Sequence, residues 1–175
     1  MTIRPLNIDP THCFIANKWV PALSGQTLAL KNPSDGTTIC DIARGNAADI
    51  DREVAAADAA LEGAWGELAA FERGRILHRI GELVLENIDE LTTLESMDVG
   101  KPVKQARADV VALARYMEFY AGAVDKIHGA TIPFLEGYTV YTMREPHGVT
   151  GHIIPWNYPM QIIGRSVGAA LAMGN

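Results

Sequence analysis

A short apolar run at 148–155, GVTGHIIP, leads through two prolines into an apolar-rich segment at 159–173, PMQIIGRSVGAALAM. Pro159 suits the first position of a helix, where its missing N–H has no helical partner to lose. The pattern predicts a strand that turns through a tight corner into a helix from Pro159 to Met173. Such a strand–helix unit opens a parallel α/β sheet, and ligands bind at the carboxyl ends of the strands in these sheets.

The preceding residues alternate between extended and helical patterns. Residues 13–20, CFIANKWV, predict a strand, a turn near Asn17 and a second strand. A further extended region at 26–43 is interrupted by the turn sequence NPSDG. Four helices are then expected. The first begins after the N-cap Asn46 and has Asp49 in its first turn, and the second covers about 72–86. The third runs from Asn87 to the stop signal at 100–102, and the fourth covers about 103–127.

Each predicted helix carries apolar residues at helical spacing. The expected inward or stripe residues are Ile50, Val54, Ala57, Leu61 and Trp65 in the first helix; Ile76, Ile80, Leu83 and Val84 in the second; Ile88, Leu91 and Leu94 in the third; and Val110, Leu113, Met117, Tyr120 and Val124 in the fourth.

At Gly129 the period changes to an alternation typical of strands. In TIPFLEGYTVYTMREP, Tyr138, Val140 and Thr142 fall on one face, and Thr139, Tyr141 and Met143 on the other. Neither face is clearly polar, which favours a strand pair with both faces partly covered, for example by another subunit.

Composition excludes several classes of function. A formal net charge of -6 and a pI of about 5.3 argue against a nucleic-acid partner. No apolar run is long enough to cross a membrane, and the N-terminal twelve residues lack the apolar core of a secretory signal. Cys13 and Cys40 show no metal-ligand spacing and indicate inert thiols in a reducing compartment, so we predict a cytoplasmic protein.

Asn157 is the candidate catalytic residue of the predicted corner. Its uncharged amide, next to a helix N-terminus, suits the stabilisation of a developing oxyanion. The alternative is that Asn157 only caps the helix and Trp156 only packs the turn. Spacing alone leaves both interpretations open.

The motifs of the chain, in their order and spacing, resemble the N-terminal portion of the NAD(P)-dependent aldehyde dehydrogenase superfamily. They extend over nearly the whole sequence: FIANKWV, NPSDG, AADIDREVAAADAAL, ERGRIL, LESMDVGKP, YAGAVDKIHGATIP, TMREPHGVTGHIIPWNYP and GAALAMGN.

The resemblance implies an α/β fold that is incomplete in this chain. Residues 1–128 would form N-terminal strands and the helical layer of the cofactor-binding domain, 129–146 strands that bridge subunits, and 147–175 the start of a Rossmann-like NAD(P)-binding core. Relatives are dimers or tetramers, which implies a homodimer or homotetramer for the full-length enzyme.

The resemblance also assigns roles to residues. The Asn157 amide would donate to the aldehyde oxygen, and Ile153, Ile154, Pro155 and Trp156 would border the nicotinamide ribose of NAD or NADP. Asp98 would line a monovalent cation site; the alternative is a helix-end or solvated carboxylate. Val99 replaces the asparagine more usual in the family.

The implied reaction converts an aldehyde to a carboxylic acid. A cysteine thiolate forms a thiohemiacetal, hydride passes to the nicotinamide, and a glutamate-activated water releases the acid from a thioester. Neither Cys13 nor Cys40 matches the family's nucleophile, so the 175-residue segment alone is expected to be inactive. It is also expected to fold poorly, because a lone strand–helix unit leaves the edges and faces of its strand uncovered. A non-catalytic fragment or interaction module is the competing interpretation.

Arg165 interrupts an otherwise apolar helix. On a helix it shares a face with Tyr158 and Ile162, which makes these three residues candidates for the substrate pocket. A guanidinium favours a carboxylate, and relatives acting on carboxylate-bearing semialdehydes often carry arginine here, so we predict such a substrate. Two alternatives stay open: Arg165 pairs with an acidic residue from the part of the enzyme outside this segment, or Tyr158 serves a cationic amino-aldehyde through a cation–π contact.

Overall fold

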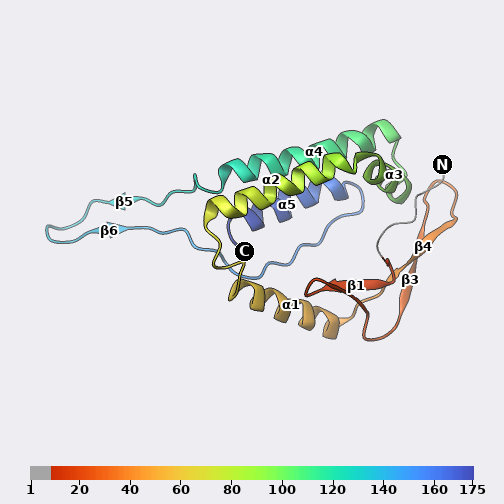
Figure 1. Cartoon of the computed structure of the whole chain (residues 1–175), viewed down its shortest axis with the longest axis horizontal. Helices are drawn as coiled ribbons and strands as arrows, with labels where there is room; N and C mark the ends of the chain where they lie inside the picture. Colours follow the sequence, from red (N-terminus) through yellow and green to blue (C-terminus); the bar gives the residue numbers. More distant parts are fainter. Residues whose placement is uncertain (1–8) are drawn as a thin grey trace.

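Helix α4 (Val103–Ala123) is the centre of the molecule. The computed structural model describes residues 9–175, so the first eight residues of the predicted 1–128 segment lie outside the described residues. Around α4 pack α2 (Ala70–Glu86), α3 (Ile88–Val99) and α5 (Pro159–Ala172) (Figure 1). The buried side chains between these helices form the hydrophobic core: Leu77, Val84, Val110, Leu113, Ala114, Met117, Val124 and Ala172.

Glycines let α2 and α5 approach α4 closely. A Cβ built on Gly74 would lie 2.8 Å from the carbonyl oxygen of Ala121, and one built on Gly164 would lie 2.9 Å from the Tyr116 side chain. The absence of a side chain at these glycines therefore lets α2 and α5 lie directly against α4.

Two antiparallel hairpins precede the helices, as the sequence predicts. β1 (His12–Ile15) pairs with β2 (Lys18–Pro21) through a two-residue turn at Ala16 and Asn17, both with positive φ. Asparagine tolerates this conformation better than most residues. β3 (Thr27–Lys31) pairs with β4 (Thr38–Ala43), and the NPSDG sequence makes the turn between them.

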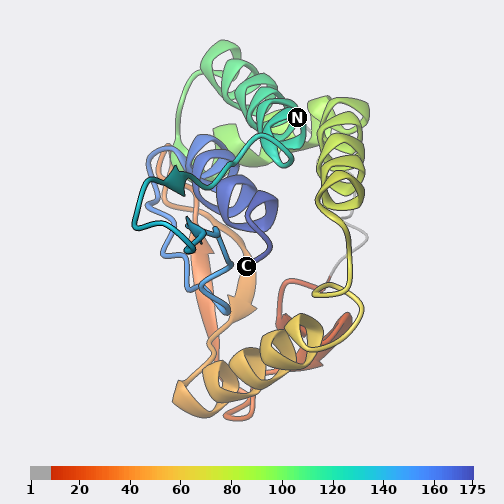
Figure 2. The same cartoon turned by 90° about the vertical axis from the view of Figure 1, so that its left-hand side faces the viewer.

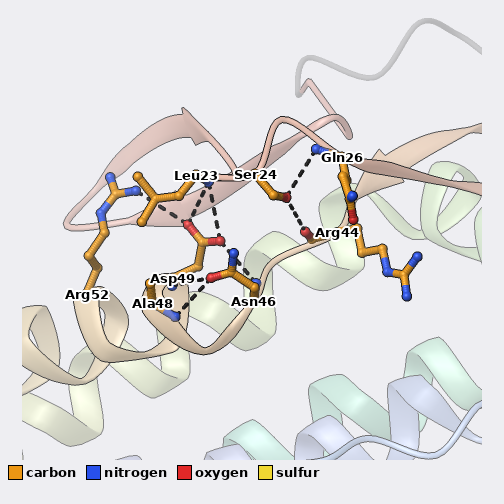
Figure 3. Close-up of polar contacts among 8 residues, drawn as sticks. All are labelled: Leu23, Ser24, Gln26, Arg44, Asn46, Ala48, Asp49 and Arg52. Carbon is orange, nitrogen blue, oxygen red and sulfur yellow. Dashed lines mark hydrogen bonds and ion pairs between the residues drawn. The ribbon is translucent and has the colours of Figure 1, made fainter.

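Helix α1 (Ala47–Leu61) is tied to the strands by a buried carboxylate. The side chain of Asn46 accepts hydrogen bonds from the Ala48 and Asp49 amides, and Asp49 accepts from the backbone N–H of Asn46 in return (Figure 3). Asp49 also accepts from the Leu23 N–H at 3.0 Å. The bonds from Leu23 and Asn46 lower the pKa of this carboxyl. The predicted N-cap is confirmed.

The predicted strand pair is present but short. β5 (Thr131–Ile132) and β6 (Val140–Tyr141) are antiparallel and belong to a long hairpin that projects from the helices (Figure 1). Its large apolar side chains, including Phe134, Leu135, Tyr138, Tyr141 and Met143, are exposed. Both faces are therefore uncovered in this chain.

The strand predicted over 148–155 is not formed. The segment is irregular, and the strands of the described chain occur as three separate two-stranded sheets that do not include it. A strand needs a neighbouring backbone to take up its N–H and C=O groups, and no such neighbour lies beside this segment. Helix α5, in contrast, begins at Pro159 as predicted.

Several predicted helix faces differ from the structure. Ile76 and Leu83 of α2 are exposed, because its buried face consists of Gly74, Leu77, Gly81 and Val84. Small residues carry the close contact there, whereas the prediction counted only large apolar ones.

Helices α1 and α4 also differ in extent and burial. Ile50 and Val54 are exposed because α1 stands apart from the other helices, and Trp65 lies beyond the end of α1 at Leu61 (Figure 2). Helix α4 ends at Ala123 rather than Ile127, but its predicted stripe packs into the core.

Candidate active site

The corner before α5 exposes the candidate catalytic amide. Residues 156–158 form a turn, Tyr158 takes the N-cap position and Pro159 the first helical position. Asn157 is therefore not the helix cap, and its side chain forms no hydrogen bond within the described chain. No side chain caps α5 either, so its first N–H groups and the Asn157 amide are neighbouring hydrogen-bond donors.

The residues predicted to border the cofactor form an apolar ledge before the turn. Ile153 is 98% exposed and Trp156 is 78% exposed, while Ile154 is partly buried. Pro155 between them is also exposed. Such exposure of large apolar side chains is unusual on a soluble protein surface and marks a binding surface when it is contiguous.

The predicted pocket residues lie along the outer side of α5. Tyr158 and Arg165 are exposed, and Ile162 is partly buried. The Arg165 guanidinium lies 5.9 Å from the ring centre of Tyr116 on α4 and has no ion pair within residues 9–175. Ile163, the neighbour of Ile162 in the sequence, packs against the core.

A buried charged cluster beneath Tyr158 was not predicted from the sequence. Lys101 donates to Glu95 Oε1 at 2.6 Å and to Asp109 Oδ2 at 2.7 Å, and its Nζ lies 4.4 Å from the ring centre of Tyr158. One signal was available: Asp109 falls in the same helical stripe as Ala106, an apolar stripe that continues through the core of α4. A carboxylate in such a stripe requires a buried partner.

Asp98 lies exposed near the end of α3, and its charge acts on Cys40 of β4. Within the part of the chain that the structure describes, no group of three or more His, Cys, Asp or Glu side chains is arranged to hold a metal ion. The cation role of Asp98 stays a prediction.

Neither cysteine has the environment of a nucleophile. Burial, followed by the charges of nearby carboxylates, raises the pKa of both the Cys13 and the Cys40 thiol. A thiol with a raised pKa forms little of the reactive thiolate at neutral pH. This agrees with the prediction that both are structural.

A model of the aldehyde dehydrogenase family matches residues 19–175. The chain belongs to this family. It is 44% identical over 167 residues to the hydroxyisobutyraldehyde dehydrogenase of Mycolicibacterium austroafricanum, an alignment covering 95% of this chain and 33% of that protein.

Solved aldehyde dehydrogenase structures share the fold. A putative aldehyde dehydrogenase from Burkholderia cenocepacia is 60% identical, with a TM-score of 0.91 over 93% of this chain and 34% of that one. The NAD+ complex of an aldehyde dehydrogenase from Bacillus cereus is 38% identical, with a TM-score of 0.92 over 95% of this chain and 34% of that one. The chain thus spans about a third of the length of the aldehyde dehydrogenases it matches.

The family match confirms the predicted α/β aldehyde dehydrogenase architecture. Among the helices of residues 9–175, none combines the length and apolarity needed to span a bilayer. Some related aldehyde dehydrogenases carry the word mitochondrial in their names, such as one from Arabidopsis thaliana at 43% identity over 97% of this chain and 32% of that protein. The cytoplasmic location of this chain stays a prediction.

Proposed function

We propose that this chain supplies the oxyanion-binding amide and part of the cofactor-binding domain of an enzyme that oxidises an aldehyde to a carboxylic acid with NAD(P)+. The observation that carries the proposal is the Asn157 side chain, which is exposed at an uncapped helix N-terminus and has no partner within the described chain. A free, uncharged donor at that place suits a carbonyl oxygen that becomes negatively charged.

The ledge beside Asn157 fits a dinucleotide. Ile153 and Trp156 present apolar surface without covering side chains, which suits the face of a flat ring and its ribose. When bound, NAD(P)+ supplies the oxidant that accepts hydride from the aldehyde carbon. Ile153, Ile154, Pro155 and Trp156 would hold the nicotinamide end against the corner.

The role of this chain in the reaction is electrostatic. When a nucleophile adds to the aldehyde carbon, the carbonyl π electrons move to oxygen. The Asn157 amide donates a hydrogen bond to that oxygen without transferring its proton, and the positive end of the α5 dipole adds to the effect. The nucleophilic thiolate and the base that activates water would come from the other two thirds of an aldehyde dehydrogenase.

The substrate we propose carries a carboxylate, as in a short dicarboxylic semialdehyde. Arg165 supports this because its guanidinium is exposed on the same helix face as Tyr158 and is not neutralised by an acidic side chain within residues 9–175. Tyr158 argues against a cationic amino-aldehyde, because one face of its ring already contacts the Lys101 ammonium. A second cation nearby would be repelled by both basic groups.

The test of the catalytic role uses the full-length protein that contains this chain. Asn157→Ala should lower kcat by about 10²- to 10³-fold, because one oxyanion donor contributes roughly that factor. Production of reduced nicotinamide is followed by absorbance. The matched control is Asn87→Ala, which removes an exposed amide that donates to Leu83 at the far end of α2. An Asn157→Ala enzyme with kcat within twofold of wild type would refute the role.

The test of the substrate class compares succinic semialdehyde with pentanal, a neutral aldehyde of similar length. Arg165→Met should lower kcat/KM for the semialdehyde by about 10- to 100-fold, because the substrate carboxylate loses a hydrogen bond to a charged group and the free energy of such a bond corresponds to roughly that factor. Pentanal oxidation should be unchanged or faster. Equal losses for both substrates would contradict the carboxylate contact but leave the Asn157 proposal intact.

The exposed hairpin supports a third part of the proposal, that the full-length enzyme is a homodimer or homotetramer. The uncovered aromatic side chains of residues 134–143 lie on a projection that makes few contacts with the rest of its own chain (Figure 1). A second copy of the chain is the partner we assign to it.

A further inference from the structure

The cluster beneath Tyr158 contains three charged groups removed from water. The side chains of Glu95 and Asp109 are 0% exposed and that of Lys101 is 9% exposed. Moving each ion out of water costs several kcal/mol, and the ion pairs recover this only with good geometry and further hydrogen bonds. An apolar cluster of the same size would stabilise the fold at least as well, so stability alone does not account for these residues.

The partners of the cluster are concentrated at the start of α5. Asp109 Oδ1 accepts from Gln161 Nε2 at 2.7 Å, as well as from Gln105 at 3.0 Å. Burial raises the pKa of Glu95, while Lys101 and the nearby Met160 N–H act in the opposite direction. Its Oε2 has no hydrogen-bond partner in the described chain.

Lys101 is the member that reaches the corner itself. Its ammonium bridges α3 and α4 through the two carboxylates and supports the Tyr158 ring at 4.4 Å. Burial acts to lower the pKa of Lys101, but the hydrogen bonds to Asp109 and Glu95 raise it above the ordinary value, so the group stays charged. A charged ammonium is what a cation–π contact requires.

Tyr158 immediately precedes the first turn of α5, Gln161 lies within that turn, and Asn157 directly precedes Tyr158. Since Asn157 has no side-chain hydrogen bond of its own within the described chain, its backbone is located through these neighbours. An amide that must meet an oxyanion tolerates little displacement, because a shift of about 1 Å can cost about 10²-fold in rate.

We propose that Lys101, held by Glu95 and Asp109, is a positioning residue that fixes Tyr158 and the first turn of α5 and thereby aims the Asn157 amide. Lys101 itself contacts no reacting atom. This inference rests on the proposed function.

The test is a double-mutant cycle on kcat in the full-length enzyme. Lys101→Met should lower kcat by about tenfold or more, which is part of the loss of about 10²-fold expected for a 1 Å displacement of the amide. KM for the aldehyde should change little. In an Asn157→Ala background the same change should have no further effect on kcat, because the group that Lys101 positions is already absent. A merely structural role predicts instead that the two losses multiply.

A second variant covers the case in which Lys101→Met does not fold. Tyr158→Leu leaves the three buried charges intact and removes only the ring that Lys101 supports. It should give the same kcat loss and the same absence of effect in the Asn157→Ala background. An unchanged kcat in Tyr158→Leu, or losses that multiply, would overturn the inference.

The matched control is Arg107→Met. Arg107 on α4 pairs with Asp89 on α3 at 2.6 Å, across the same two helices but at the exposed surface. Breaking this pair should leave kcat unchanged, because exposed ion pairs contribute little. Failure of the two proposals is distinguishable: if Asn157→Ala does not lower kcat, the proposed function fails, whereas a normal Asn157 effect with multiplying Lys101 losses removes only the positioning role.

Discussion

Replacement of Gly74 by alanine tests the close packing of α2 against α4. The added Cβ would lie 2.8 Å from the backbone oxygen of Ala121 and 3.0 Å from Val124 Cγ2, about 0.6 Å inside ordinary van der Waals contact. Because the nearest atom belongs to the backbone of α4, one helix must move. Overpacking of this kind costs about 1–3 kcal/mol, while alanine regains about 1 kcal/mol of helix propensity.

Gly122 provides the matched control, because a Cβ built there meets nothing within 4 Å. Both substitutions replace a helical glycine by alanine, but only the one at Gly74 adds a steric cost of about 1–3 kcal/mol. Hydrogen exchange of peptides from α2 and α4 in the full-length protein measures the local opening free energy. Gly74→Ala should exchange about 5- to 150-fold faster than Gly122→Ala. Equal exchange in the two variants would refute the packing argument.

Three further predictions use other parts of the chain. The Leu23 and Asn46 amides lower the Asp49 pKa, so the ionised Asp49 carboxylate stabilises the fold above pH about 4 and this stabilisation is lost as the pH falls. In Asp49→Asn, the free energy of unfolding measured by urea denaturation should therefore decrease less on acidification. Tyr138→Ser combined with Tyr141→Ser should shift the full-length enzyme towards smaller oligomers in sedimentation, and an unchanged sedimentation coefficient would exclude the hairpin from the interface. Gly100→Ala should speed hydrogen exchange in the α3–α4 turn by more than Gly25→Ala speeds it around residue 25. Both glycines have positive φ, but only a Cβ at Gly100 would clash, at 2.8 Å from the Pro33 side chain.

Local signals predicted most elements because the residues that form them act within a few positions. Asn46 with Asp49, the turn at Asn17, Gly100 at the end of α3 and Pro159 at the start of α5 all take the predicted roles. Each satisfies backbone groups or sets a backbone angle in its own segment, so the surrounding fold is not needed to recognise it.

The failures have a common cause in contacts between distant segments. The 148–155 strand depends on a neighbour that is not beside it, and the inward face of α2 depends on how closely α4 approaches Gly74 and Gly81. Glu95 was missed because a glutamate is acceptable at a helix surface. The apolar stripe around Asp109 calls for a buried partner, but only the folded structure shows that this partner is Lys101.

The exposed surface explains why the candidate site must be tested in the full-length protein. The chain exposes 11702 Å², whereas a compact monomer of 18.9 kDa would expose about 8300 Å². Much of the apolar part lies on the hairpin and at Ile153 and Trp156. Exposed apolar side chains beside one free hydrogen-bond donor, at Asn157, are typical of a ligand site. Without a covering segment, however, water competes for that donor and would weaken its hydrogen bond to an oxyanion. The catalytic role that we propose for the Asn157 amide therefore requires that the rest of the enzyme exclude water from the corner.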